Sequence, residues 1–163
     1  MSPPDPHPSA APSLEVAVVR LPHAEDLPLP AAATAGSAAV DLRAAVDAAL
    51  TLEPGARAAV PTGLAIAVPP DHEAQVRARS GLALRHGVTV VNGVGTIDAD
   101  YRGEVHALLI NLGDAPFAIA RGMRIAQLVI APIVAPSRLR WRAVEALPPS
   151  ARDAGGFGST GVD

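Results

Sequence analysis

The feature that most limits the fold of this chain is a series of short apolar runs broken by glycine and proline. The runs are rich in Val, Ile, Leu and Ala, and they span residues 14–21, 63–70, 104–113 and 124–134. Pairs that favour tight turns stand between them: Pro54-Gly55, Asn92-Gly93 and Gly113-Asp114. Short strands at this spacing, without long helical stretches between them, predict an all-β fold, a β-barrel or a jelly roll.

The run at 104–113 differs from the others in its pattern. It begins with alternation and continues as an unbroken apolar stretch, which predicts a strand buried on both faces. Aromatic residues make up only 2% of the chain, so aliphatic side chains must fill the core.

One segment has the signals of a short helix. Residues 80–87, SGLALRHG, begin with Ser80 as a favourable N-cap and end with a glycine that favours helix termination. The middle of the chain, residues 14–145, is predicted to be one domain. Residues 1–13 contain five prolines and are predicted to be a disordered leader, and residues 146–163 to be an extended arm.

Composition excludes several classes of function. The net charge is −3, every basic residue is arginine and no basic block occurs, so we expect no nucleic-acid partner. The absence of cysteine excludes disulfides, thiol nucleophiles and Cys-ligated zinc. No apolar run is long enough for a membrane span and the first residues do not form a signal peptide, so we expect a cytoplasmic protein.

The stretch RARSGLALRHG contains a candidate anion site. Arg79 and Ser80 stand at the start of the predicted helix, and Gly81 allows a ligand to approach the backbone. The guanidinium of Arg79 suits phosphate oxygens. The alternative is that Ser80 and Gly81 only cap the helix.

A second candidate lies in NGVGTIDADYRGEV, residues 92–105. The Asn92-Gly93 pair predicts a tight hairpin turn. In a cleft, Asp98 would accept a proton from water, Asn92 would bind an amide-like base edge and Tyr101 would pack on a sugar. The alternative is a surface hairpin whose aspartates cap turns.

Three further places carry polar residues in unusual settings. Asp41 stands among small and apolar residues, where a carboxylate needs a partner or a cation. Arg121, Arg124 and Gln127 flank or interrupt an apolar strand, and Gln127 is the better candidate for a ligand group. In the tail, Arg152, Ser159 and Thr160 surround glycines in a loop able to wrap phosphates, although the Walker sequence is absent.

The order of these segments resembles the trimeric dUTPases, the deoxyuridine triphosphate nucleotidohydrolases. The five ordered motifs of that family have counterparts here: AGSAAVDL, RSGLA, GTIDADYRGE, RGMRIAQL and RDAGGFGSTG. The resemblance implies a jelly roll of the β-clip type, a homotrimer with active sites at subunit interfaces, and Mg²⁺-dependent cleavage of dUTP to dUMP and pyrophosphate. Such an activity keeps uracil out of DNA and supplies dUMP for dTMP synthesis.

The resemblance also implies a role for each residue of the nucleoside site. Asp98 would activate the water that attacks the α-phosphorus, and Tyr101 would pack under deoxyribose and exclude a 2′-hydroxyl. His106, on the following strand, is a further candidate for lining the site. The residues that would bind uracil come from the hairpin: Asn92, Gly95, Thr96 and Ile97.

The phosphate site implied by the resemblance draws on the other motifs. Asp41 would help to place Mg²⁺ through water. The phosphates would be held by Arg79, Ser80, Gly81 and Gln127. The C-terminal arm would close over the nucleotide, with Phe157 on the uracil face and Arg152 on the terminal phosphate. The remaining contacts of the arm would come from Gly158, Ser159 and Thr160.

Two departures from the family pattern and two alternative functions are notable. Ala39 and Asp153 stand where the family usually has glycine, so a changed strand near Asp41 and altered arm closure are expected. A dCTP deaminase of the same superfold is one alternative, but Leu108 lies near the place of its catalytic glutamate. The other is a non-enzymatic jelly-roll binding protein, against which the retained polar residues argue.

Overall fold

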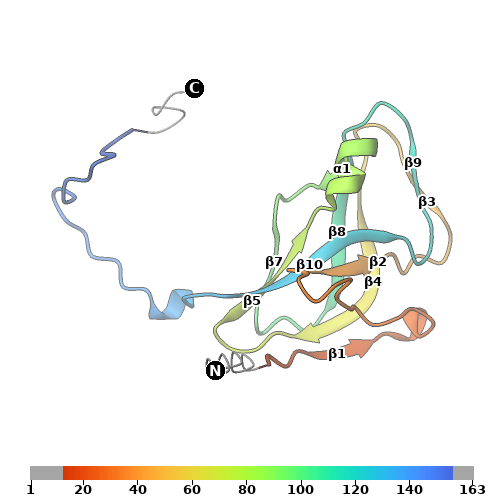
Figure 1. The fold of residues 1–163 in the computed structure, drawn as a ribbon, viewed down its shortest axis with the longest axis horizontal. Helices are drawn as coiled ribbons and strands as arrows, with labels where there is room; N and C mark the ends of the chain where they lie inside the picture. Colours follow the sequence, from red (N-terminus) through yellow and green to blue (C-terminus); the bar gives the residue numbers. More distant parts are fainter. Residues whose placement is uncertain (1–12, 156–163) are drawn as a thin grey trace, which may run out of the picture.

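A computed structural model describes residues 13–155; residues 1–12 and 156–163 lie outside the described part. The described chain is mostly β structure with one α-helix and two 3-10 turns (Figure 1). The strands are β1 Ala17–Arg20, β2 Val40–Arg43, β3 Leu50–Leu52, β4 Arg57–Ala67, β5 His72–Arg77, β6 Val88–Val90, β7 Gly95–Ile97, β8 Glu104–Asn111, β9 Phe117–Ile119 and β10 Arg124–Pro132. The helices are η1 Pro22–Ala24, α1 Ser80–His86 and η2 Pro136–Arg138.

The strands form three antiparallel sheets. One sheet has the order β1-β4-β8-β6, the second has the order β2-β10-β5-β7, and β3 pairs with β9 in a two-stranded ribbon. The prediction of a predominantly β chain is confirmed. Within residues 13–155 the sheets are open, and no closed barrel is formed.

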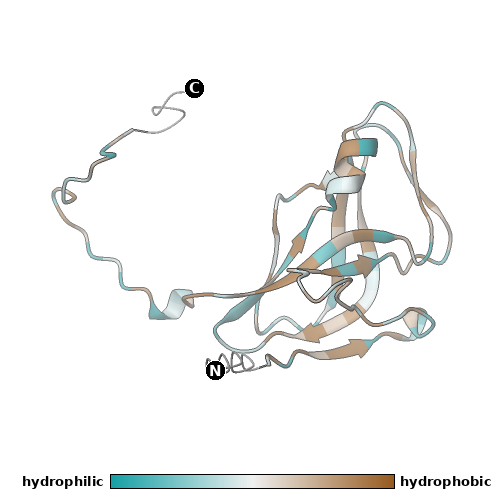
Figure 2. Cartoon of the chain, in the orientation of Figure 1, coloured by the Kyte–Doolittle hydropathy of each residue, from teal (hydrophilic) through white to brown (hydrophobic). Residues whose placement is uncertain are grey.

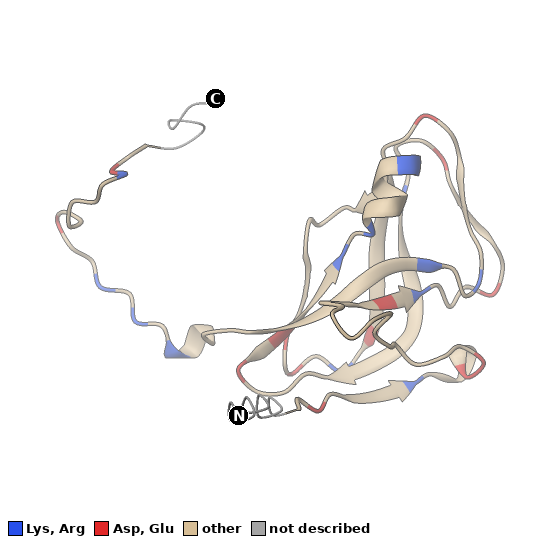
Figure 3. Ribbon diagram, viewed as in Figure 1, with Lys and Arg blue, Asp and Glu red and all other residues tan. Residues whose placement is uncertain are grey.

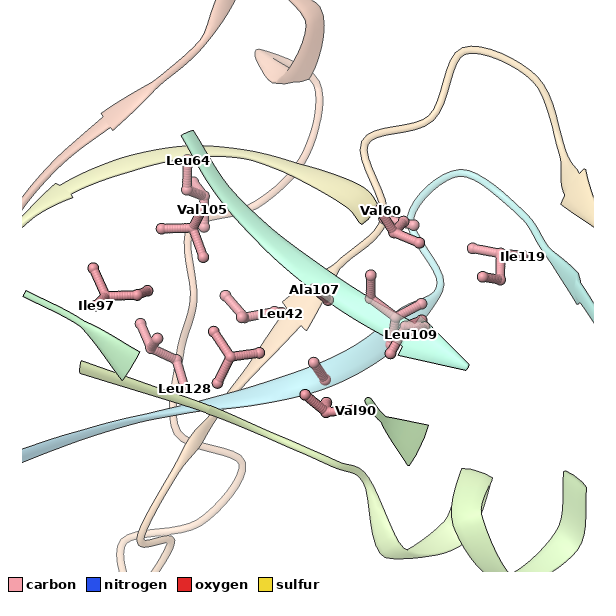
Figure 4. Packing of buried hydrophobic residues seen from close by; sticks show 14 of the residues in the cluster. Leu42, Val60, Leu64, Val90, Ile97, Val105, Ala107, Leu109, Ile119 and Leu128 are labelled. Atoms are coloured by element: carbon pink, nitrogen blue, oxygen red, sulfur yellow. The ribbon is translucent and has the colours of Figure 1, made fainter. Parts of the chain in front are cut away.

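The core lies between the two four-stranded sheets and is aliphatic (Figure 4). Leu42 of β2, Leu109 of β8 and Leu128 of β10 project into it, and hydrophobic residues predominate along β8 and β10 (Figure 2). Strand β8 alternates strictly, with Val105, Ala107 and Leu109 buried and the residues between them facing outward. The expected burial of this strand on both faces is therefore wrong for the single chain.

Two local predictions also need correction. Gly93 has the positive φ of 76° that its turn requires, but no hairpin forms, because β6 pairs with β8 and β7 pairs with β5. The turn instead carries the chain from one sheet to the other. Helix α1 is present, but its N-cap is Arg79, which is extended, and Ser80 is the first helical residue. The carbonyl of Arg79 accepts the amides of Leu82 and Ala83.

Strand pairing ends at Pro132. Residues 133–155 contain only η2 as a regular element and run away from the sheets in Figure 1. Basic residues are spaced along this segment (Figure 3), and Trp141 within it is 92% exposed. Within residues 13–155, no helix has the length and apolar character needed to cross a membrane.

Candidate functional site

A cavity of about 230 Å³ lies between β7 and the first half of β8. It contains seven of the residues predicted to bind the nucleoside: Asn92, Gly95, Thr96, Ile97, Asp98, Tyr101 and His106. The remaining lining residues are Val76, Glu104, Val105 and Leu108. Residues of the predicted 92–105 motif and of the strand that follows it therefore line one cavity.

Strand β7 gives this cavity a polar backbone wall. It lies at the edge of its sheet and pairs with β5 along one side only. Among residues 13–155, the N–H and C=O groups that point away from β5 have no strand partner, as at any sheet edge. An edge of this kind offers donors and acceptors to a planar heterocycle with amide-like groups.

Asp98 and Tyr101 stand at the two ends of a turn beside β7. The amide of Tyr101 donates to the carbonyl of Asp98 at 3.1 Å, and both residues are exposed at the cavity. The tyrosine ring lies over Gly103, where an added Cβ would be 2.6 Å from Tyr101 Cζ. Only glycine leaves the ring in this place, so Gly103 determines where the Tyr101 ring lies.

A separate polar cluster lies on β2, β10 and the residue before α1. Asp41 Oδ1 accepts from Arg79 Nε at 3.0 Å, and Asp41 Oδ2 accepts from Arg124 Nη1 at 3.1 Å. Arg79 Nη1 also donates to the carbonyl of Arg124 at 3.2 Å. The Asp41 side chain is 18% exposed, so its burial is compensated by the two guanidinium groups. The prediction that this carboxylate needs a partner is confirmed.

A bulge in β10 brings Arg124 to this cluster. Arg124 pairs with Arg43 and Ala126 with Leu42, so Ile125 is an extra residue in β10. Ile125 and Ala126 are both buried as a result. In a regular strand, residues 124 and 127 would point to opposite faces. The bulge places both on the outer face, beside Asp41.

Gln127 connects the cluster to the neighbouring strands. Its ladder partners are Asp41 on β2 and Arg77 on β5. Gln127, Asp41 and Ala39 line a second cavity of about 220 Å³. Ser80 and Gly81 begin α1 directly after Arg79. Apart from Arg152 on the arm, the predicted phosphate ligands of the described chain are thus grouped by β2, β10 and the start of α1.

The two groups lie apart in the single chain. The two cavities share no residue. Strands β2 and β7 are opposite edges of one sheet, three interstrand spacings apart, or roughly 14 Å. One chain therefore presents a nucleoside cavity at one edge of this sheet and an arginine-rich cluster at the other.

The predicted Mg²⁺ would depend on the oxygen donors near Asp41. Residues 13–155 contain no group of three or more His, Asp or Glu that could hold a metal ion. Mg²⁺ in nucleotide enzymes usually keeps several waters and is bound by substrate phosphates with one or two carboxylates. Asp41 retains lone pairs beyond its two arginine contacts, so the residues fit an ion that arrives with phosphates and reaches Asp41 through water.

The last part of the predicted site is only partly described. Arg152 is exposed and donates through Nε to the carbonyl of Gly155 at 2.8 Å. Asp153 has φ +45°, in the region that favours glycine, which is the residue that the resemblance implies at this place. Four predicted arm ligands lie outside the described residues: Phe157, Gly158, Ser159 and Thr160.

Some residues take places that the sequence did not indicate. Arg121 belongs to a different contact: it donates to Asp26 Oδ2 at 3.1 Å and to the carbonyls of His23 and Val46. Hydrogen bonding to Arg121 holds the pKa of Asp26 below its usual 3.8.

Glu104 and Val76 line the nucleoside cavity without having been predicted. Glu104 could have been identified from its position within the GTIDADYRGE motif. No sequence feature indicated that Val76 lines the cavity.

The chain is similar to known proteins along most of its length. The dUTPase family model matches residues 25–161. The chain is 59% identical over 151 residues to a deoxyuridine 5′-triphosphate nucleotidohydrolase of Methylocella silvestris, covering 91% of this chain and 92% of that protein. It is 54% identical to the enzyme of the same name from Rhizobium meliloti, covering 99% of each chain.

Solved structures show the same fold. The dUTPase of Staphylococcus bacteriophage 80alpha with dUPNHPP matches with a TM-score of 0.80 and 26% identity, over 92% of this chain and 100% of the phage chain. The family model spans well over half of the sequence, and the curated relatives are similar over nearly their whole length. This chain belongs to the dUTPase family.

Proposed function

We propose that this protein hydrolyses dUTP to dUMP and pyrophosphate. The observation that carries the proposal is the cavity at the free edge of β7, which has Asp98 and Tyr101 at its wall. Its backbone edge suits the amide-like edge of uracil, and Tyr101 at its wall offers a surface on which a sugar can pack. Membership of the dUTPase family and the names of the relatives support the same reaction.

In the proposed mechanism, the protein positions its substrate and supplies one base. Asn92, Gly95, Thr96 and Ile97 hold uracil, and Tyr101 packs against deoxyribose. Asp98 accepts a proton from the water that attacks the α-phosphorus, a role worth on the order of 10²–10⁴ in rate. Pyrophosphate is the leaving group. His106 lines the nucleoside side of the cavity.

Phosphate charge is neutralised by the second cluster. Arg79, Ser80, Gly81 and Gln127 hold the phosphates, and Asp41 keeps Arg79 and Arg124 oriented. Asp41 would hold Mg²⁺ through water, and the ion would supply charge neutralisation on the phosphate oxygens. Arg152, Phe157, Gly158, Ser159 and Thr160 close over the bound nucleotide from the arm.

We further propose a homotrimer of jelly-roll subunits in the cytoplasm, with a domain over residues 14–145, a leader over 1–13 and an arm over 146–163. The trimer is supported by the separation of the two clusters across the β2-β10-β5-β7 sheet. An active site formed between subunits unites the nucleoside cavity of one chain with the arginine cluster of its neighbour. The exposed segment after Pro132 is consistent with an arm that packs on another subunit.

The test is a turnover assay of the purified protein with Mg²⁺. We expect conversion of dUTP to dUMP and pyrophosphate, with much slower turnover of UTP and dTTP. Release of ammonia from dCTP would support the deaminase alternative, which Leu108 at the cavity does not favour because it supplies no acid. No turnover of dUTP would overturn the proposal and leave a binding role.

A further inference from the structure

Glu104 is a cavity-lining residue whose carboxylate is directed away from solvent. Its side chain is 17% exposed. Oε1 accepts from the amide of Gly63 at 2.7 Å and lies 3.1 Å from His23 Nε2. Oε2 lies 3.9 Å from His106 Nε2. The carboxylate is therefore committed to contacts within the protein.

The amide that Glu104 accepts belongs to a bulge in β4. Pro61 pairs with His106 and Ala65 pairs with Glu104, so residues 62–64 all face Val105. Thr62 Oγ1 donates to the carbonyl of Val105 at 2.6 Å, and Glu104 accepts the Gly63 amide. Gly63 is buried, so this amide would lose its acceptor if the carboxylate were removed.

The main chain of Glu104 is connected to the cavity. Its carbonyl accepts from the Tyr101 hydroxyl at 3.1 Å and lies 3.1 Å from His106 Nδ1. Tyr101 also lies on Gly103, with no room for a Cβ beneath the ring. The ring is thus fixed along its face by Gly103 and at its hydroxyl by Glu104.

We propose that Glu104 is a positioning residue for sugar selection: by binding the Gly63 amide with its side chain, it fixes the carbonyl that holds the Tyr101 hydroxyl, and so determines how firmly the cavity excludes a 2′-hydroxyl. This inference rests on the proposed hydrolysis of dUTP. A ribose requires the ring to move, whereas a deoxyribose does not. Loosening the hydroxyl contact therefore favours UTP more than it harms dUTP.

The test compares kcat and KM for dUTP and UTP in the full-length protein with Mg²⁺. Glu104→Ala and Tyr101→Phe should each lower the dUTP-to-UTP ratio of kcat/KM by up to about tenfold, the net worth of one hydrogen bond. Glu104→Gln keeps an oxygen for the Gly63 amide and should retain the ratio. The double variant Tyr101→Phe/Glu104→Ala should be no less selective than either single variant, because both remove the same link.

Glu53→Ala is the control, since Glu53 is exposed in the β3–β4 turn, away from the cavity, and should leave both constants unchanged. An unchanged ratio in a folded Glu104→Ala protein overturns the inference, as does an equal loss of turnover for both nucleotides. If Glu104→Ala does not fold, an unchanged ratio in Tyr101→Phe overturns it. Failure of the unaltered protein to hydrolyse dUTP is a separate result, because it overturns the proposed function itself.

Discussion

Asp41 and Gln127 are direct partners across the antiparallel β2–β10 pair, and both line the same cavity. Their pairing fixes the strand register at the candidate phosphate site. The bulge at Ile125 then adds Arg124 to the same face, and the chain before α1 adds Arg79. The Asp41 carboxylate binds both arginines of this group.

Asp41→Asn should weaken nucleotide binding. The amide keeps the shape of the side chain but removes the charge that orients Arg79 and Arg124. We expect the Kd of a non-hydrolysable dUTP analogue, measured by calorimetry with Mg²⁺, to rise about tenfold, in keeping with a charged hydrogen bond. Asp26→Asn removes an Asp–Arg pair outside the site and should leave the Kd unchanged. Tighter binding by Asp41→Asn would show that the carboxylate opposes the phosphates.

Asp98→Asn should retain nucleotide binding and lose turnover. An amide at this place cannot accept a proton from water, so kcat should fall on the order of 10²–10⁴-fold. Single-turnover kinetics with dUTP measure the chemical step directly. Asp100→Asn is the matched control, because Asp100 is also exposed but does not line the nucleoside cavity. Full activity in Asp98→Asn would require another base.

Gly63→Ala should destabilise the fold strongly. A Cβ at this position would overlap the Ala24 side chain and lie 3.2 Å from Ala45 Cβ, and φ is +69°. Backbone strain of about 1–2 kcal/mol adds to overpacking of about 1–3 kcal/mol in the free energy of unfolding. Gly55→Ala isolates the backbone part, because its φ is +79° with open space around it. In denaturant unfolding at equal protein concentration, Gly63→Ala should lower the free energy of unfolding more than Gly55→Ala does. Equal losses in the two variants would contradict the packing argument.

Removal of the Asp26 carboxylate should make stability less dependent on pH in the acid range. Hydrogen bonding to Arg121 lowers the pKa of Asp26 from 3.8 in the folded state. The pair therefore stabilises the fold above pH 3.8, and this contribution is lost as the pH falls through the lowered pKa. The unfolding midpoints of Asp26→Asn and the unaltered protein should differ at pH 7 and converge as the pH falls below 3.8. Asp114→Asn, at an exposed turn residue, should show no such convergence.

Truncation after Ser150 should leave an assembled protein with severely reduced turnover. The deletion removes Arg152 and the rest of the proposed arm, while every described strand is retained. Removal of residues 1–12 is the control and should leave turnover unchanged. Mixing truncated subunits with Asp98→Asn subunits should restore part of the activity if the arm serves another chain's Asp98. Mixed assemblies no better than either parent would contradict arm exchange.

The longer strands and the separate motifs were predictable from sequence. Apolar runs located β8, β10 and only the last part of β4, and the ordered motifs indicated Asp98, Tyr101 and Gln127 as candidate site residues. Strands of three residues, such as β3 and β9, are too short to show any periodicity.

The bulges could not be predicted, because they depend on partner strands. A spacing of three residues between Arg124 and Gln127 indicates opposite faces unless an extra residue intervenes. Likewise, nothing in the sequence indicates that the Glu104 side chain accepts a hydrogen bond from the Gly63 amide. The link from Glu104 to Tyr101 became visible only with the register of β4 and β8.

The shared register of β2, β10 and β5 also limits how this sequence can change in length. Gln127 is paired on both sides, so inserting or deleting one residue in β10 would turn its side chain into the core and expose Ala126 or Leu128. Length changes should therefore accumulate in the connections, such as residues 28–34 and residues 133–150. Homologues should vary there and keep the interval between Arg124 and Gln127 constant.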